Sequence, residues 1–219
     1  MFVDKIIGCK IAISDERASA PDVKELLRLL GDIQVAGLLS QKKGILHVHL
    51  GGKSSGMAIL LELVEKYQAP IRRISPTHVG RTRPLFDEAI RFAKLGGMID
   101  ISTGGTKFDE PYKQVLLALE QGVSMDNMTL SSDGNAGVMI KNDEGEIIGY
   151  RKAPIDLNFK QVVKLINDGG IDPSEAFKLI TSSPARNLSL PHKGTIVVGG
   201  DADFCFLDEE YTLYDVIAK

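Results

Sequence analysis

The feature of this sequence that most constrains its fold is the regular alternation of short apolar runs with longer amphipathic segments. The apolar runs have the length of β-strands and cover residues 5–13, 45–50, 71–76, 98–102 and 128–132. Between them, helices are predicted at residues 21–39, 54–67, 84–95 and 111–121. Strands that alternate with helices in this way predict a parallel sheet joined by right-handed crossovers, and therefore an α/β fold.

The pattern changes after Asp133. A hairpin is predicted over residues 139–151, with its turn at residues 143–145, and a helix over residues 159–168. Asp172 followed by Pro173 is typical of a helix start, because Asp caps the first turn and Pro needs no hydrogen-bond partner there. The last part of the chain contains short β segments, which we expect to be antiparallel, at residues 194–198, 202–207 and 212–217.

The five apolar runs leave two architectures open. They are too few to close an eight-stranded barrel, which typically needs about 250 residues. One possibility is an open sheet with helices on both faces. The other is that they are the last five strands of a barrel whose first three strands are absent from this chain.

Composition excludes several classes of protein. The net charge of −3 does not suggest a nucleic-acid surface. No run reaches the roughly 18 apolar residues of a membrane span, and the first residues lack the order of a signal peptide. Cys9 and Cys205 lie in apolar runs, so we expect both to be reduced and buried. These features predict a cytoplasmic protein with neither a nucleic-acid nor a membrane partner.

Three residues with metal-binding side chains close predicted strands. His49 and His78 end the second and third strands, and Asp133 follows the fifth. Singly, each has an ordinary structural explanation, since a strand-end histidine is often a hydrogen-bonded residue and an Asp before Gly is often a turn former. Together, they would point into one mouth at the carboxyl ends of the strands, where α/β folds place their sites. Imidazole and carboxylate are the ligands expected for catalytic zinc.

The other two histidines fit this hypothesis less well. His47 and His49 form a His-x-His pair on one strand and share a face. His47, however, lies two residues deeper in the strand, so we interpret it as a packing or supporting residue. His192 follows Pro191 and is interpreted as a surface residue.

Three cationic residues have two interpretations each. Lys10 lies within an apolar run, so it is either an edge-strand lysine whose amine reaches solvent or a desolvated lysine with a reactive amine. A reactive amine would form a Schiff base or be carboxylated by CO2. Arg17 and Arg81 follow predicted strands, where an arginine is either simply solvated or clamps a substrate carboxylate.

Taken in order, these segments resemble the β-aspartyl (isoaspartyl) dipeptidases of the amidohydrolase superfamily. The resemblance covers nearly the whole chain and is carried by residues 8–19, His49 with Leu50-Gly51, residues 76–81, residues 130–135 and the closing motifs at residues 181–185, 193–194 and 200–203. It implies a (β/α)8 TIM-barrel type of fold, of which this chain holds about the last five strands. The barrel part would cover residues 1–190, and residues 191–219 would supply β segments of a small composite β-sandwich.

The resemblance also implies a chemistry. Lys10 would be a carboxylated lysine bridging two zinc ions, with His49 and His78 binding one ion and Asp133 the other. Asp133 would also accept a proton from the attacking hydroxide and pass it to the leaving amine. Arg17 and Arg81 would hold the carboxylates of a small β-aspartyl dipeptide. A homo-oligomer is expected.

The chain departs from the family pattern in ways that leave alternatives. No His-x-His pair precedes Lys10, and Gly137 stands where the family often has a serine. We therefore expect the isolated chain to be inactive as a dipeptidase. The alternatives are another amidohydrolase, either a dihydroorotase-like cyclic amidase or an N-acyl amino-acid deacylase, and a non-catalytic fragment that folds by association.

Overall fold

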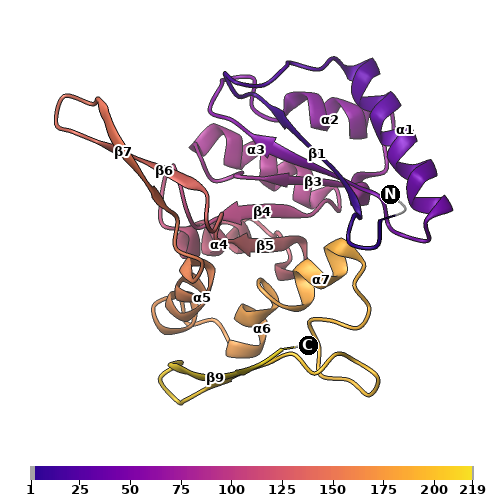
Figure 1. Cartoon of the computed structure of the whole chain (residues 1–219). Helices are drawn as coiled ribbons and strands as arrows, with labels where there is room; N and C mark the ends of the chain where they lie inside the picture. The colour runs from indigo at the N-terminus through magenta and orange to yellow at the C-terminus, as the bar shows by residue number, and fades with distance from the viewer. Residues whose placement is uncertain (1–2, 219) are drawn as a thin grey trace.

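The centre of the molecule is a five-stranded parallel sheet. The computed structural model describes residues 3–218 and places the strands in the order β1-β2-β3-β4-β5 (Figure 1). The strands are β1 (Gly8–Ile13), β2 (Ile45–Leu50), β3 (Ile74–Thr77), β4 (Ile99–Ser102) and β5 (Met128–Ser131). Every strand predicted for the first part of the chain is therefore present. Residues 71–73 were predicted as strand but form the 3-10 turn η1 (Ile71–Arg73), which begins after Pro70.

The four predicted crossover helices are also confirmed. They are α1 (Val23–Leu39), α2 (Ala58–Glu65), α3 (Arg83–Lys94) and α4 (Pro111–Glu120). Asp22 and Glu25 form a capping box at the start of α1, which explains why this helix begins there. Thr82 caps α3 with its hydroxyl, and both α3 and α4 carry proline in their first turn, where a missing N–H costs little.

The two faces of the sheet differ in chemistry. Leu46, Val48 and Leu50 on β2 alternate with polar residues and belong to one buried apolar cluster with residues of α1 to α4. Strand register aligns the polar residues of neighbouring strands in rows on the opposite face. These residues are Lys10, His47, His49, Ser75, Thr77, Asp100, Ser102, Thr129 and Ser131.

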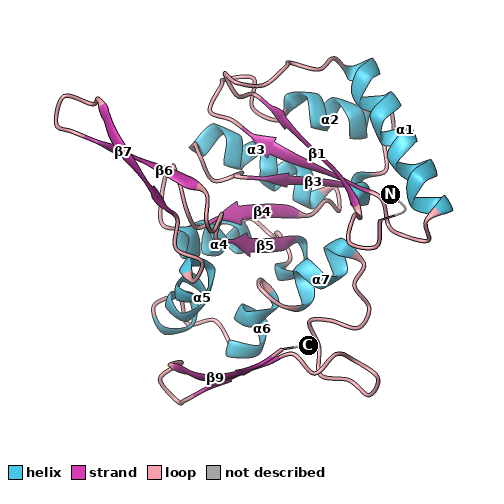
Figure 2. Ribbon diagram, in the orientation of Figure 1, coloured by secondary structure: helices cyan, strands magenta, loops and turns pink. Residues whose placement is uncertain are grey.

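This one-sided packing decides between the two architectures left open by the sequence. An open doubly wound sheet carries helices on both faces and is apolar throughout its strands. Here helices α1 to α4, cyan in Figure 2, pack into one apolar core, and the other face of the sheet carries the polar residues. The arrangement is that of a TIM-barrel segment, as predicted, with the polar face on the inside.

The chain continues from β5 into a hairpin that projects away from the sheet (Figure 1). Its strands are β6 (Gly137–Lys141) and β7 (Ile147–Lys152), which confirms the predicted hairpin. Two helices follow, α5 (Leu157–Asn167) and α6 (Pro173–Lys178). The Asp172 side chain accepts a hydrogen bond from the Ser174 amide, so the predicted cap of α6 is confirmed.

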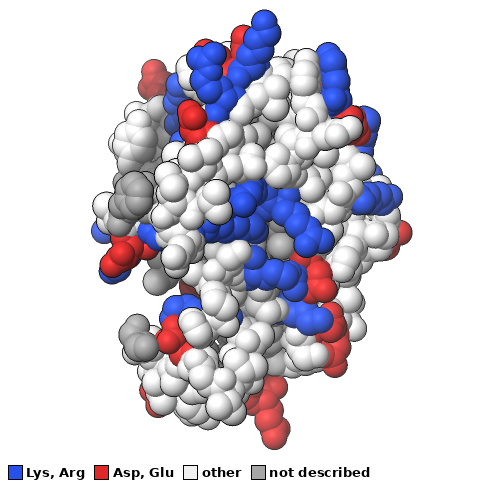
Figure 3. Space-filling model, turned by 90° about the vertical axis from the view of Figure 1, so that its right-hand side faces the viewer, with Lys and Arg blue, Asp and Glu red and all other residues white. Residues whose placement is uncertain are grey.

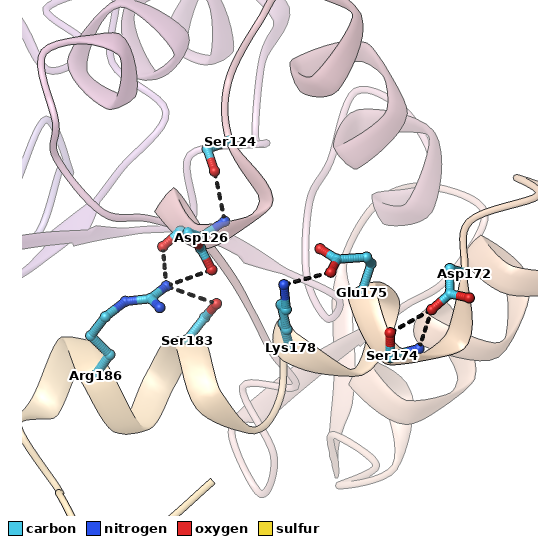
Figure 4. Close-up of polar contacts among 8 residues, drawn as sticks. All are labelled: Ser124, Asp126, Asp172, Ser174, Glu175, Lys178, Ser183 and Arg186. Carbon is cyan, nitrogen blue, oxygen red and sulfur yellow. Dashed lines mark hydrogen bonds and ion pairs between the residues drawn. The ribbon is translucent and has the colours of Figure 1, made fainter. Parts of the chain in front are cut away.

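Helix α7 (Ser182–Leu188) was not predicted from the sequence. Its first residues are serines and its N-cap, Thr181, makes no side-chain hydrogen bond, so the local sequence gives little signal for a helix. Figure 4 shows Arg186 directed at Asp126, where its guanidinium donates to the backbone oxygen at 2.6 Å and to the carboxylate at 3.1 Å. On the same helix, Asn187 donates to the Ser75 hydroxyl at 2.9 Å and so ties α7 to the polar face of the sheet.

The last β segments form the antiparallel pair β8 (Phe204–Leu207) and β9 (Leu213–Ile217). The strand predicted at residues 194–198 was wrong, because these residues have no strand alongside them to complete a hydrogen-bond ladder within residues 3–218.

Cys9 and Cys205 are free, but their predicted burial was wrong. Both are exposed, since one lies on edge strand β1 and the other on a two-stranded hairpin. Among the described residues, no helix has the length and apolarity to span a bilayer.

The amino ends of the strands carry a cluster of cations, visible as the central blue group in Figure 3. Lys43 precedes β2, and its pKa is lowered by burial and by the charges of Arg73, Arg72 and Arg186. Lys43 itself donates to the Asn187 carbonyl at 2.5 Å. Three of the four metal ligands predicted from the sequence, His49, His78 and Asp133, lie at the opposite, carboxyl ends of the strands.

Candidate active site

Strand order and strand length bring the predicted ligands to the same edge of the sheet. His49 is the penultimate residue of β2, His78 directly follows β3, and Asp133 lies two residues beyond β5. His78 and Asp133 both have left-handed backbone conformations, with φ of 65° and 51°. Non-glycine residues adopt this conformation rarely, and it is often associated with functional sites. The chain therefore turns sharply at both residues as it leaves the sheet.

The two predicted histidine ligands lie in contact. The ring centroids of His49 and His78 are 4.5 Å apart, with the rings edge to face at 70°. Each ring uses one nitrogen in a hydrogen bond: His49 Nε2 lies 3.2 Å from Asp15 Oδ2, and His78 Nδ1 lies 2.6 Å from Ser102 Oγ. The other nitrogens, His49 Nδ1 and His78 Nε2, make no hydrogen bond within residues 3–218.

Burial keeps both rings neutral near physiological pH. It lowers the pKa of His78 to about 3, and the positive charges of Arg81 and Lys10, with those of His49 and His47 when these rings are protonated, act in the same direction. The pKa of His49 is also lowered, mainly by burial, although its hydrogen bond to Asp15 opposes the shift. A neutral imidazole has a lone pair to offer, which is the form that binds a metal ion.

Asp15 connects the loop after β1 to His49. Its carboxylate receives two hydrogen bonds from the Arg17 guanidinium, both at 3.0 Å, and these hold the pKa of Asp15 well below its usual value. Gly51 permits this approach, because a Cβ there would lie 2.1 Å from the Ser14 carbonyl oxygen and 2.3 Å from the Asp15 Cα. Sequence reasoning selected Arg17 but missed Asp15, although Asp15 lies in the same Ser14-Asp-Glu-Arg17 segment.

Arg81 differs from Arg17 in having a buried donor without a partner. Its Nε is buried and makes no hydrogen bond within the described residues. Burial lowers the pKa of Arg81, and the carboxylates of Asp15 and Asp133 oppose that shift. A buried donor without an acceptor is costly unless a ligand supplies one. Arg81 therefore fits a carboxylate-binding role, whereas the Arg17 guanidinium is already engaged by Asp15.

Lys10, His78 and Asp133 line one cavity of about 290 Å³ on the polar face of the sheet. His47 also lines it, and its pKa is lowered, chiefly by burial. Lys10 is exposed on edge strand β1, which agrees with the edge-strand interpretation of this residue. The remaining lining residues are Ser75, Thr77, Asp100, Thr129, Leu130, Ser131, Pro184, Asn187 and Leu188. His192 is exposed and is not among them, as expected.

The donor set fits a metal ion in part. The adjoining neutral imidazoles of His49 and His78, each with one uncommitted nitrogen, suit a divalent transition metal. Within residues 3–218, however, no group of three or more His, Cys, Asp and Glu side chains is arranged to hold an ion. Lys10 would join the ligand set only if CO2 carboxylated its amine, because the side chain would then end in a carboxylate.

A buried polar network behind His78 was missed by sequence reasoning. Asp100, on β4, accepts hydrogen bonds from the hydroxyls of Thr77, Thr129 and Ser131 at 2.5, 2.7 and 2.6 Å. Ser102 links this network to His78. The only signal in the sequence was an aspartate inside an otherwise apolar strand, in Ile99-Asp-Ile101.

Comparison with known proteins identifies the family to which this chain is similar. A model of the amidohydrolase family matches residues 46–217. Two crystal structures of beta-aspartyl dipeptidase from the thermophilic keratin degrader Fervidobacterium islandicum AW-1 are similar along nearly the whole chain. The one in complex with beta-Asp-Leu dipeptide has a TM-score of 0.88 at 37% identity, covering 99% of this chain and 58% of that chain. The other has a TM-score of 0.85 at 35% identity and covers 99% and 55%.

A shorter match involves a different activity. An adenine deaminase of Methanoregula boonei is 44% identical over 41 residues, which are 19% of this chain and 7% of that protein. This chain spans a little over half the length of the two dipeptidase structures that it resembles.

Proposed function

This chain belongs to the amidohydrolase family, and we propose that it forms the part of a metal-dependent dipeptidase that binds one metal ion and a substrate carboxylate. The substrate would be a β-aspartyl dipeptide. The observation that carries the proposal is the contact between two neutral imidazoles at the carboxyl ends of β2 and β3, with Arg81 beside them. The similarity to a dipeptidase structure that holds beta-Asp-Leu supports the choice of substrate.

Each residue has a separate role in this proposal. His49 and His78 would hold one zinc ion, Asp133 a second, and a carboxylated Lys10 both. The metal would supply Lewis-acid activation of a water molecule and of the scissile carbonyl. The Asp133 carboxylate, exposed at the cavity mouth, would take the proton from the attacking water and deliver it to the leaving amine.

The arginines would select the substrate. A β-aspartyl dipeptide carries two carboxylates, and the unpartnered Nε of Arg81 is a donor suited to one of them. Arg17 would act differently, because its fork is bonded to Asp15. We propose that the remaining N–H groups of its exposed guanidinium bind the second carboxylate, while the bonded ones orient Asp15 against His49.

The setting of the protein is part of the proposal. Two free cysteines agree with a reducing compartment, so we propose a cytoplasmic location. Strands β1 and β5 are the edges of the sheet, and β9 exposes Leu213, Tyr214 and Val216. Exposed edges and apolar strands favour association, so we propose a homo-oligomer.

The metal half of the proposal is tested by elemental analysis of the purified chain after equilibration with zinc. We expect bound zinc to fall in His49→Asn and His78→Asn, and Lys10→Ala to lose any second equivalent. His192→Asn is the matched control, since His192 is exposed and lies away from the cavity. Equal zinc in all four variants and in the native chain would contradict the assignment of the ligands.

The substrate half is tested by calorimetric titration of the zinc-loaded chain with β-Asp-Leu and with α-Asp-Leu. We expect tighter binding of the β-linked dipeptide and loss of that preference in Arg81→Gln. Arg83→Gln is the control, because Arg83 is two residues away and paired with Asp87 on the helix surface. Binding of adenine in place of either dipeptide would favour a deaminase instead.

A further inference from the structure

The hydrogen bonds behind His78 form a continuous chain from a buried carboxylate to the imidazole ring. Thr77 Oγ1 lies 2.5 Å from Asp100 Oδ2 and 3.4 Å from Ser102 Oγ, which lies 2.6 Å from His78 Nδ1. All four residues are buried, with exposed fractions of 3% to 7%. These hydrogen bonds join two adjacent strands, β3 and β4, with the turn after β3.

The direction of each hydrogen bond follows from counting protons. A carboxylate only accepts, so Thr77 gives its one hydroxyl proton to Asp100. In its contact with Ser102, which at 3.4 Å is longer than a typical hydroxyl–hydroxyl hydrogen bond, Thr77 can then only accept, so Ser102 is the donor there. The 2.6 Å contact between Ser102 and His78 allows either direction, and a Ser102 that gives its proton to Thr77 accepts from the ring, which places the ring proton on Nδ1.

We propose that this hydroxyl relay, from Asp100 through Thr77 and Ser102, fixes the ring tautomer of His78 and leaves Nε2 unprotonated for a metal ion. Thr77, Asp100 and Ser102 are therefore positioning residues, acting through His78. Metal-binding histidines depend on a partner that holds the second ring nitrogen, and removing such a partner typically weakens metal binding about 10- to 100-fold. The metal-affinity part of this inference rests on the proposed function, while the tautomer part does not.

Two isosteric variants separate the relay from simple support of the fold. Thr77→Val and Thr129→Val each remove one hydroxyl donor to Asp100 and replace threonine by a side chain of the same shape. Only Thr77 lies between Asp100 and Ser102. In Thr77→Val, Ser102 has no acceptor at that position and is free to donate to His78 Nδ1, which would move the ring proton to Nε2.

The first measurement is the tautomer of His78 in the chelator-treated, 15N-labelled chain, read from long-range proton–nitrogen correlation spectra. We expect Nδ1 protonated and Nε2 unprotonated in the native chain and in Thr129→Val, and a mixed or reversed pattern in Thr77→Val. Ser102→Ala should lose the preference, and Ser102→Thr, which retains a hydroxyl, should restore it. A native ring protonated on Nε2 would overturn the proposal, even if no variant folds.

The second measurement is zinc affinity by competition with a chelating dye. We expect Thr77→Val and Ser102→Ala to bind zinc about 10- to 100-fold more weakly than the native chain, and Thr129→Val to bind as tightly as the native chain. Equal losses in the two threonine variants would mean that Thr77 acts only through stability and would refute the relay. If the tautomers behave as expected but the native chain binds no zinc, the relay stands and the proposed metal role fails.

Discussion

Replacing His78 by asparagine should remove a large part of the acid sensitivity of the metal-free chain. The folded-state pKa of His78 is about 3, against an ordinary value of 6.5. Between these values the unfolded chain binds a proton at this ring and the folded chain does not. Stability from this group is therefore complete above about pH 6.5 and is lost progressively as the pH falls toward 3.

The size of the effect follows from the same two values. When the pH is lowered from about 7.5 to about 4.5, the final pH lies about two units below the unfolded-state pKa of 6.5. Each of these units corresponds to about 1.4 kcal/mol of lost stability. His78 should thus account for a loss of about 3 kcal/mol in the free energy of unfolding. His78→Asn keeps a side chain that tolerates the local φ of 65°, so the variant should fold.

Urea unfolding of both proteins at the two pH values, with a chelator present, measures this difference. The native chain should lose about 3 kcal/mol more than His78→Asn on acidification. His47 and His49 titrate in both proteins, so they contribute little to the comparison, and His192→Asn should behave like the native chain. An identical pH dependence in the native chain and His78→Asn would refute the argument that burial keeps this ring neutral.

Two further predictions concern the loop beside the site and the first helix. Gly51→Ala should lower the free energy of unfolding by about 1–3 kcal/mol, because its Cβ would collide with the Ser14–Asp15 backbone. Gly52→Ala, where the new Cβ meets nothing within 4 Å, is its control in urea unfolding, and equal losses would count against the collision. Asp22→Ala should cost about 1 kcal/mol through loss of the capping box of α1, measured by thermal unfolding. Asp32→Ala, in the middle of the same helix, should cost less, and the reverse order would exclude the cap as the cause.

Much of the fold could be predicted because the relevant signals are local. Strand β2 was predicted with the bounds that the structure has, since its apolar run is bracketed by Gly44 and Gly51. The start of α6 was also predicted, because Asp172 caps this helix through the Ser174 amide, two positions away. Helix α7 was not predicted, because the contacts that hold it, from Arg186 to Asp126 and from Asn187 to Ser75, join residues far apart in the sequence.

The sequence by itself determined the order of strands and helices, the parallel sheet, and which residues end each strand, because side-chain periodicity and capping act over a few residues. Only the tertiary structure decided that the crossover helices α1 to α4 share one side of the sheet and that Asp15 contacts His49. It alone also decided that Arg81 has a buried donor without a partner while Arg17 pairs with Asp15, and that Asp100 lies behind His78. These features depend on distances between residues far apart in the chain, which no local pattern encodes. Burial, which sets the charge of the histidines, exists only once those residues have come together.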